Sequence, residues 1–328
     1  MNIQSNGNFI ISLDFELLWG VHDHETKESF SENIMGARKG IQQMLSMFQE
    51  YGIHATWGVV GLLMAENPKD CIYYSPEKKP EYETPSLSSY GYFDSLGQNE
   101  ADDIYHYAHS LVSDILKYEH QEIGSHTFSH YYCLEKGQTI YSFEDDLKAA
   151  QKIANDKFGL ELKSLILPRN QFNEEYLKVA HNCNFISLRG NPRHYAYNNN
   201  TSLARGLRLL DAYTNICGKK SYSIESFNGN IINLKASAFF RHYDKRLSFL
   251  EPFKINCIKH QMKKAAQKGE IFHLWWHPHN IGKDTEKNLQ QIRKLLAYYC
   301  KLNSYYGFES KNMKELAEEI INENSNVM

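Results

Sequence analysis

Short apolar runs alternate with longer segments of helical periodicity along most of the chain, and this alternation restricts the fold more than any other feature. Residues 9–14 are apolar on both faces and rich in β-branched side chains, as in a buried strand of a parallel sheet. Apolar residues then recur at helical spacing over residues 34–51, Gly52 provides a stop, and residues 53–60 form a second apolar run. A strand, a helix and a second strand in this order are the repeating unit of a parallel α/β fold.

The same rhythm continues to the end of the chain, with two interruptions. Further strands are expected at residues 120–125, 162–167, 185–188, 231–240 and 271–276, and further helices at 102–117, 143–158, 173–181, 249–267, 284–299 and 313–321. Residues 66–99 and 191–230 lack a clear period and are expected to be insertions. About seven strands with no break in composition favour a single domain over residues 1–328, built as a (β/α) barrel.

Composition excludes several classes of protein. A formal net charge of -3, with acidic and basic residues intermixed, provides no basic field for nucleic acid. Six cysteines without a C-x-x-C spacing fit reduced thiols better than a disulfide framework. The amino terminus is polar, and the first apolar run is interrupted by Asp14 and Glu16. This pattern fits neither a signal peptide nor a membrane segment. We therefore expect a cytoplasmic protein without a nucleic-acid partner.

Two histidines four residues apart follow a short apolar run that ends in Gly124. His126 and His130 can fall on one face of a helical bend, and neutral imidazole is the commonest zinc ligand. A third ligand should be a carboxylate from elsewhere in the chain. Asp14 and Glu16 lie two apart at the end of the first strand, so their side chains point the same way and repel each other unless a cation or hydrogen bonds satisfy them.

Polar residues also follow two later strands. Arg169 lies just after the run at 162–167, and His277 follows the run at 271–276. Together with Asp14 and His126, they lie at or just beyond the carboxyl ends of four expected strands, which is where parallel α/β folds assemble their sites. The sequence therefore predicts one site, built from separate loops.

These motifs, in this order, resemble those of the polysaccharide deacetylase family, the carbohydrate esterases similar to the nodulation oligosaccharide deacetylase. The acidic first motif resembles residues 12–16, the His-Ser/Thr-x-x-His motif resembles residues 126–130, the motif with Arg and Pro resembles residues 167–170, and the last, a hydrophobic strand ending in His, resembles residues 274–277. The motifs span about residues 9–280. Two departures are visible: Phe15 separates the two acids, which are adjacent in the family, and Pro168 precedes Arg169 instead of following it.

The resemblance implies a distorted (β/α) barrel with fewer strands than eight and a divalent metal held by one carboxylate and two histidines. By the family's order Asp14 is the catalytic base and Glu16, His126 and His130 are the metal ligands, although Asp14 and Glu16 can exchange roles. Arg169 would keep Asp14 ionised, and His277 would protonate the leaving amine. The family also has an aspartate that orients the catalytic histidine, and Asp211 is a candidate for it. Zinc is the expected metal, and nickel and cobalt accept the same ligands.

Substrate contacts are suggested by the residues around His277. Trp275 can stack on a sugar ring or pack the barrel, and His279 and Asn280 can contact substrate or shape a turn at Pro278.

Three functions fit these features. The first is a metal-dependent hydrolase that removes an N-acyl (acetyl) group from an amino sugar. This amino sugar would be an intermediate of surface polysaccharide synthesis. The second is a deformylase or small-amide amidohydrolase using the same metal site, and the third is a catalytically silent carbohydrate-binding barrel. The oligomeric state and the exact substrate are not indicated by the sequence.

Overall fold

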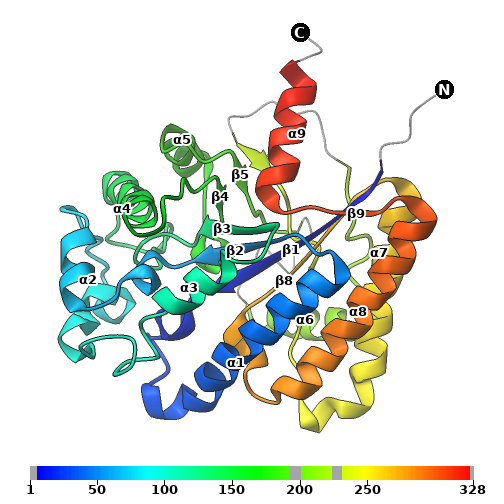
Figure 1. The fold of residues 1–328 in the computed structure, drawn as a ribbon, viewed down its shortest axis with the longest axis horizontal. Helices are drawn as coiled ribbons and strands as arrows, with labels where there is room; N and C mark the ends of the chain where they lie inside the picture. The colour runs from blue at the N-terminus through cyan, green and yellow to red at the C-terminus, as the bar shows by residue number, and fades with distance from the viewer. Residues whose placement is uncertain (1–5, 193–200, 224–230, 326–328) are drawn as a thin grey trace.

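A curled parallel sheet forms the centre of the molecule (Figure 1). The structure is a computed structural model that describes residues 6–192, 201–223 and 231–325. Strands follow in the order β6-β5-β4-β3-β2-β1-β8-β7, with β9 paired to β1, and every pairing between these strands is parallel. The predicted distorted (β/α) barrel is therefore confirmed, although the described residues form nine strands where about seven were expected.

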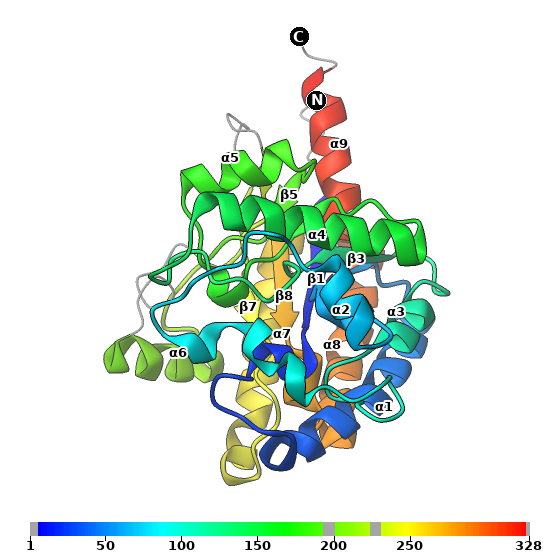
Figure 2. The ribbon, with the colours of Figure 1, turned by 90° about the vertical axis from the view of Figure 1, so that its left-hand side faces the viewer.

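The strands and helices alternate as the apolar pattern predicts. The strands are β1 (Asn8–Phe15), β2 (Ala55–Val59), β3 (Gln121–Ser125), β4 (Ser164–Leu165), β5 (Ser187–Leu188), β6 (Ile232–Asn233), β7 (Ala238–Phe239), β8 (Ile271–Trp276) and β9 (Glu309–Ser310). The helices are α1 (Lys27–Tyr51), α2 (Pro68–Tyr74), α3 (His109–Ile115), α4 (Ile140–Phe158), α5 (Glu174–Asn182), α6 (Ser202–Thr214), α7 (Glu251–Lys268), α8 (Thr285–Tyr306) and α9 (Met313–Ser325). Helices α7 and α8 pack side by side, as do α4 and α5, which cross the front of Figure 2.

Several boundaries differ from the prediction for identifiable reasons. The expected strand at 231–240 is two short strands, β6 and β7, on opposite ends of the sheet path. Helix α3 starts seven residues later than the expected 102, because Asp103 instead accepts hydrogen bonds from Gly97 N and Lys27 Nζ and so shapes a loop. Helix α4 starts earlier than expected, because Thr139 is its N-cap and Ser142 completes a capping box.

The two regions expected to be insertions contain helices of their own. Helix α2 and two short 3-10 helices lie within residues 66–99, and α6 lies within residues 191–230. Residues 193–200 and 224–230 of the second region lie outside the described residues. The single-domain organisation stays a prediction.

Apolar side chains are buried on both sides of the sheet. The larger cluster joins the outer faces of β1, β2 and β8 to the surrounding helices. A smaller cluster includes Ile10, Ile166 and Ile232 and is covered by Met313 and Leu316 of α9. Helix α9 therefore closes the barrel at one end, and this leaves the other end available for a site. Within the described residues, no helix combines the length and the apolar character needed to cross a membrane.

An ion pair fixes α9 to the amino ends of β2 and β3. Glu315 Oε2 lies 2.6 Å from Nδ1 of His54, which immediately precedes β2, and also accepts the backbone N–H of Asn312. Partial burial alone would raise the pKa of Glu315, but the hydrogen bond and charge of His54 outweigh it and lower the pKa.

Because this carboxyl pKa is depressed in the folded protein, its stabilising contribution is complete above the unfolded pKa of about 4.3 and is lost as the pH falls through the folded value. Glu315→Gln should therefore lower the free energy of unfolding by about 1 kcal/mol at pH 7, and the difference from wild type should shrink below about pH 4. Urea denaturation across this pH range measures both. Glu318→Gln, on the exposed side of the same helix, should change neither value.

Candidate metal centre

Strand register brings the predicted residues to one edge of the sheet. Phe15 lies opposite Val59 and Val59 lies opposite Ser125, so Glu16 and His126 each follow one residue later at the same level. In parallel strands paired residues point to the same face. Because Leu13 lies opposite Trp276, the next residues, Asp14 and His277, are also level with each other.

Three buried side chains converge there. Glu16 Oε2 lies 2.9 Å from His126 Nε2 and 3.1 Å from His130 Nε2. The exposed fractions of these residues are 3%, 1% and 4%. One carboxylate and two imidazoles in this arrangement are a ligand set for zinc and similar divalent metals.

Hydrogen bonding indicates that a positive charge belongs between His126 and Glu16. His126 Nδ1 lies 2.8 Å from the carbonyl oxygen of Ile166, which can only accept, so Nδ1 carries the hydrogen. In the neutral ring Nε2 then directs a lone pair at the Glu16 oxygen, an arrangement that a divalent cation would stabilise. Burial lowers the pKa of His130 to about 4, so this second imidazole is neutral near pH 7, as a metal ligand must be.

A second group with three ligand atoms close together, His54, His120 and Glu315, is less suited to a metal. The two imidazole rings stack in parallel, 3.8 Å apart, so their ring nitrogens do not converge on one point. Within the described residues, the buried group at Glu16 is the better candidate.

The loop between the two histidines is held by an acid that the sequence reasoning missed. Asp146, fully buried on α4, accepts the backbone N–H groups of Phe128 at 2.7 Å and Ser129 at 3.1 Å. Thr127 and His130, on either side, have φ of 64° and 57°, a left-handed conformation that is unfavourable for a β-branched or bulky residue. Asp146 therefore stabilises a strained loop that directs both imidazoles inward. An acid on the apolar face of an expected helix was the signal for it.

Asp14 lies beside the three ligands and forms an ion pair with Arg189. Both terminal nitrogens of the buried guanidinium contact the two carboxylate oxygens, with Nη2 at 2.7 Å from Oδ2. Burial alone would raise the pKa of Asp14, but the charge and hydrogen bonds of Arg189 outweigh it, and the pKa is lowered.

Arg169, which was expected to contact Asp14, does not. Its guanidinium pairs with Asp23 at 2.7 Å and Glu135 at 3.1 Å and is partly exposed. Arg169 has a φ of 54° in a 3-10 turn after Pro168, and its side chain meets Asp23 and Glu135 and not Asp14. Arg189 takes the expected place, and its signal in the sequence was a charged residue immediately after the expected strand at 185–188.

His277 lies between the acids and the open side of the site. Its Nε2 is 3.6 Å from Asp14 Oδ2 and 3.6 Å from Glu16 Oε1. Asn280 Nδ2 lies 3.2 Å from His277 Nδ1 and donates to it, so that Nε2 is the ring nitrogen that carries a proton. The structure places the Asn280 amide against this ring, and a contact of Asn280 with substrate stays a prediction.

Three other residues singled out in the sequence, His279, Trp275 and Asp211, lie around Asp14 and Glu16 or farther away. His279 is 2% exposed, with Nε2 at 3.8 Å from Glu16 Oε1, so it forms part of the wall behind the ligands. Trp275 stacks on the guanidinium of Arg189 at 4.1 Å and lines an adjoining cavity. Asp211, the candidate for orienting the catalytic histidine, instead pairs with Lys220 and accepts the backbone N–H of Cys217.

Fold and site together define a half-open (β/α) barrel with a candidate metal centre at the carboxyl ends of its strands. Comparison with known proteins agrees with this class: residues 35–187 match the model of the polysaccharide deacetylase family. The matched range includes His126 and His130 but not Asp14, Glu16 or His277. The resemblance of this chain to the polysaccharide deacetylase family is confirmed.

Two solved structures have a similar fold. A presumed polysaccharide deacetylase from Mycobacterium smegmatis has a TM-score of 0.64 and 12% identity, covering 99% of this chain and 93% of its own. The 4-alpha-glucanotransferase from Thermococcus litoralis has a TM-score of 0.51 and 13% identity, covering 95% of this chain and 40% of its own. At these identities the likeness concerns the fold alone. No curated protein matches the sequence.

The ligand assignment predicts how metal content responds to substitution. Glu16→Ala and His130→Ala each remove one of three ligands and should lower the bound metal per chain, measured by inductively coupled plasma mass spectrometry after dialysis, by about tenfold or more. His277→Ala should retain the wild-type content. Equal metal content in all three variants would contradict the assignment.

Gly20 provides the space that Glu16 occupies. A methyl group added at Gly20 would lie 2.0 Å from Cδ and 2.1 Å from Oε1 of Glu16, so the carboxylate would have to move away. Gly20→Ala should therefore lower metal content by about tenfold while the protein stays folded by circular dichroism. Gly91→Ala, where an added methyl group meets nothing within 4 Å, is the matched control and should bind metal as wild type does.

Proposed function

We propose that this protein is a metal-dependent hydrolase that removes an N-acyl group, with acetyl as the expected group, from an amino sugar. The observation that carries the proposal is the convergence of Asp14 and His277 on the group formed by Glu16, His126 and His130. The likeness to the polysaccharide deacetylase family supports the reaction and the sugar substrate.

The residues present fit the requirements of amide hydrolysis. A divalent cation held by Glu16, His126 and His130 would supply a water of lowered pKa and polarise the acyl carbonyl. Asp14, kept ionised by Arg189, accepts the proton of the attacking water. His277 donates a proton to the departing nitrogen, which is otherwise a poor leaving group.

The arrangement of charges favours Asp14 as the base over Glu16. Glu16 Oε2 is directed at two imidazole nitrogens, as a ligand would be, whereas both oxygens of Asp14 are occupied by the Arg189 guanidinium. An ionised carboxylate in this position retains lone pairs that can accept a proton. The allocation follows the order of the two acids in the family's first motif.

The metal and the location of the protein complete this proposal. Zinc is proposed as the metal, with nickel and cobalt as substitutes that suit the same ligands. All six cysteines are free thiols, and this supports the proposed cytoplasmic location.

The test is release of acid from N-acetyl and N-formyl amino sugars by the metal-loaded protein, with acetate and formate measured separately. We expect acetate release by the wild type, and a loss of kcat of about 10²-fold or more in Asp14→Asn and His277→Ala, because each removes a proton-transfer group. Release of formate alone would identify a deformylase. A wild-type protein that binds metal and sugar but releases neither acid would identify a silent carbohydrate-binding barrel.

Asp14→Asn leaves the buried Arg189 without its carboxylate partner, which can destabilise the fold. Circular dichroism and metal content are therefore measured on each variant. His277→Ala lies outside this ion pair and provides an independent test of the same chemistry.

A further inference from the structure

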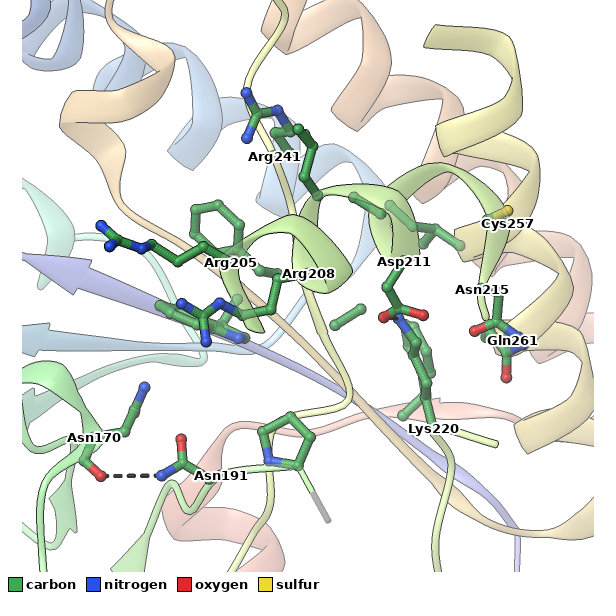
Figure 3. Close-up of a pocket in the computed structure, with 18 of the residues that line it drawn as sticks. Asn170, Asn191, Arg205, Arg208, Asp211, Asn215, Lys220, Arg241, Cys257 and Gln261 are labelled. Carbon is green, nitrogen blue, oxygen red and sulfur yellow. Dashed lines mark hydrogen bonds and ion pairs between the residues drawn. The ribbon is translucent and has the colours of Figure 1, made fainter. Parts of the chain in front are cut away.

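A cavity of about 450 Å³ adjoins the candidate metal centre (Figure 3). It begins at His277 and Trp275, passes the end of β7 at Phe239, and continues between α6 and α7. His277 and Trp275 belong to both the cavity and the edge of the metal centre. A substrate whose N-acyl group reaches His277 would therefore place the rest of its structure in this cavity.

The side chains that line the cavity carry an excess of positive charge. Arg205, Arg208, Arg241 and Lys220 all line it, and Asp211 is the one acid among its described lining residues. Asp211 pairs with Lys220. Since Arg205 and Arg208 are three apart on α6, they lie on the same face of the helix, and Figure 3 shows them close together.

The inner end of the cavity contains buried polar atoms without a partner. Gln261 on α7 is 2% exposed, and both its Oε1 and its Nε2 have no hydrogen-bond partner within the described part of the chain. Asn215 Oδ1, beside Gln261 in Figure 3, and Arg241 Nε, elsewhere in the lining, also have no hydrogen-bond partner among the described residues. A buried polar atom without a partner is unfavourable, and a polar ligand or water in the cavity would supply the missing hydrogen bonds.

We propose that this cavity binds the phosphate or diphosphate group of the substrate, which is thus a phosphorylated amino sugar rather than a neutral polysaccharide chain. The inference rests on the proposed function, because it places the N-acyl group of the same molecule at His277. Guanidinium groups suit phosphate because their N–H donors form paired hydrogen bonds with its oxygens. Trp275 and Phe239 provide apolar surface for the sugar ring between the two ends.

The size of the cavity agrees with such a ligand. Ligand cavities typically have volumes of about 300–1,000 Å³, and the volume of this cavity, about 450 Å³, lies within that range. The phosphate can belong to a nucleotide sugar or to a lipid-linked sugar, because both carry a diphosphate next to the first sugar. The cavity recognises the chemistry that these two classes share.

The binding test uses isothermal titration calorimetry with the metal-loaded His277→Ala variant, which retains its metal ligands and should turn over substrate about 10²-fold or more slowly than the wild type. N-acetylglucosamine 1-phosphate should bind about tenfold or more tightly than N-acetylglucosamine. The double substitution Arg205→Ala and Arg208→Ala should remove most of this difference, whereas Arg246→Ala, an exposed arginine outside the cavity, should leave it unchanged. Equal affinity for the two sugars, or a difference that the double substitution does not alter, overturns the inference.

Gln261→Met separates a binding role from a structural one. The replacement has a similar volume and removes two buried polar atoms without partners, so the melting temperature should not fall. If Gln261 contacts the ligand, affinity for the sugar phosphate should fall severalfold, and unchanged affinity counts against the inner part of the site.

Turnover distinguishes this inference from the proposed function. The wild type is compared on N-acetylglucosamine, its 1-phosphate, a uridine diphosphate sugar and a prenyl diphosphate sugar. Higher kcat/KM for any phosphorylated substrate, lost in the double arginine variant, supports the inference, and the preferred substrate tells whether a nucleotide or a lipid carries the phosphate. Equal turnover of the neutral sugar overturns the inference and leaves the hydrolase intact. Arginine-dependent binding without turnover of any substrate overturns the hydrolase and leaves the binding site intact.

Discussion

The placement of the Glu16 carboxylate opposite two imidazole nitrogens is the constraint on which the rest of this structure depends. The carboxylate is taken to its position by the end of β1, and the imidazoles by the end of β3 and the loop after it. The parallel register of the sheet brings these residues, more than a hundred positions apart in the sequence, to one level. The long buried β1, paired with β2 on one side and β8 on the other, thus determines the site as well as the core.

The fold could be predicted well from the sequence because its signals are local. Apolar periodicity identified the long strands and most helices, and glycines such as Gly159 and Gly269 end helices in the left-handed conformation, as expected of C-caps. The short strands β6 and β7 were predicted as one strand at residues 231–240, because a strand of two residues is too short to show a period in the sequence. Strand β9 and the start of α3 depend on contacts with distant parts of the chain, which a local pattern does not record.

The residues of the candidate site also fall into those with a local signal in the sequence and those that depend on distant contacts. Residues that follow long strands, such as Asp14, Glu16 and His277, could be found from their positions along the sequence. Arg189 and Asp146 could not be assigned, since the role of each depends on which distant group it meets in space. The assignment of Arg169 shows the difference: Arg169 and Arg189 both follow predicted strands, but after the turn at Pro168 Arg169 meets Asp23 and Glu135, and Arg189 meets Asp14.

The charges around the centre explain why these residues belong together. Asp14 and Glu16 contribute two negative charges in a buried place, and Arg189 balances one of them. Without a further cation, the buried group would keep one unbalanced negative charge, which is costly in a medium of low polarity. A divalent cation would change this excess to one positive charge, and that sign suits both the oxyanion of amide hydrolysis and an anionic substrate. The cationic cavity next to His277 extends the same sign outward along the path by which a phosphorylated sugar would reach the centre.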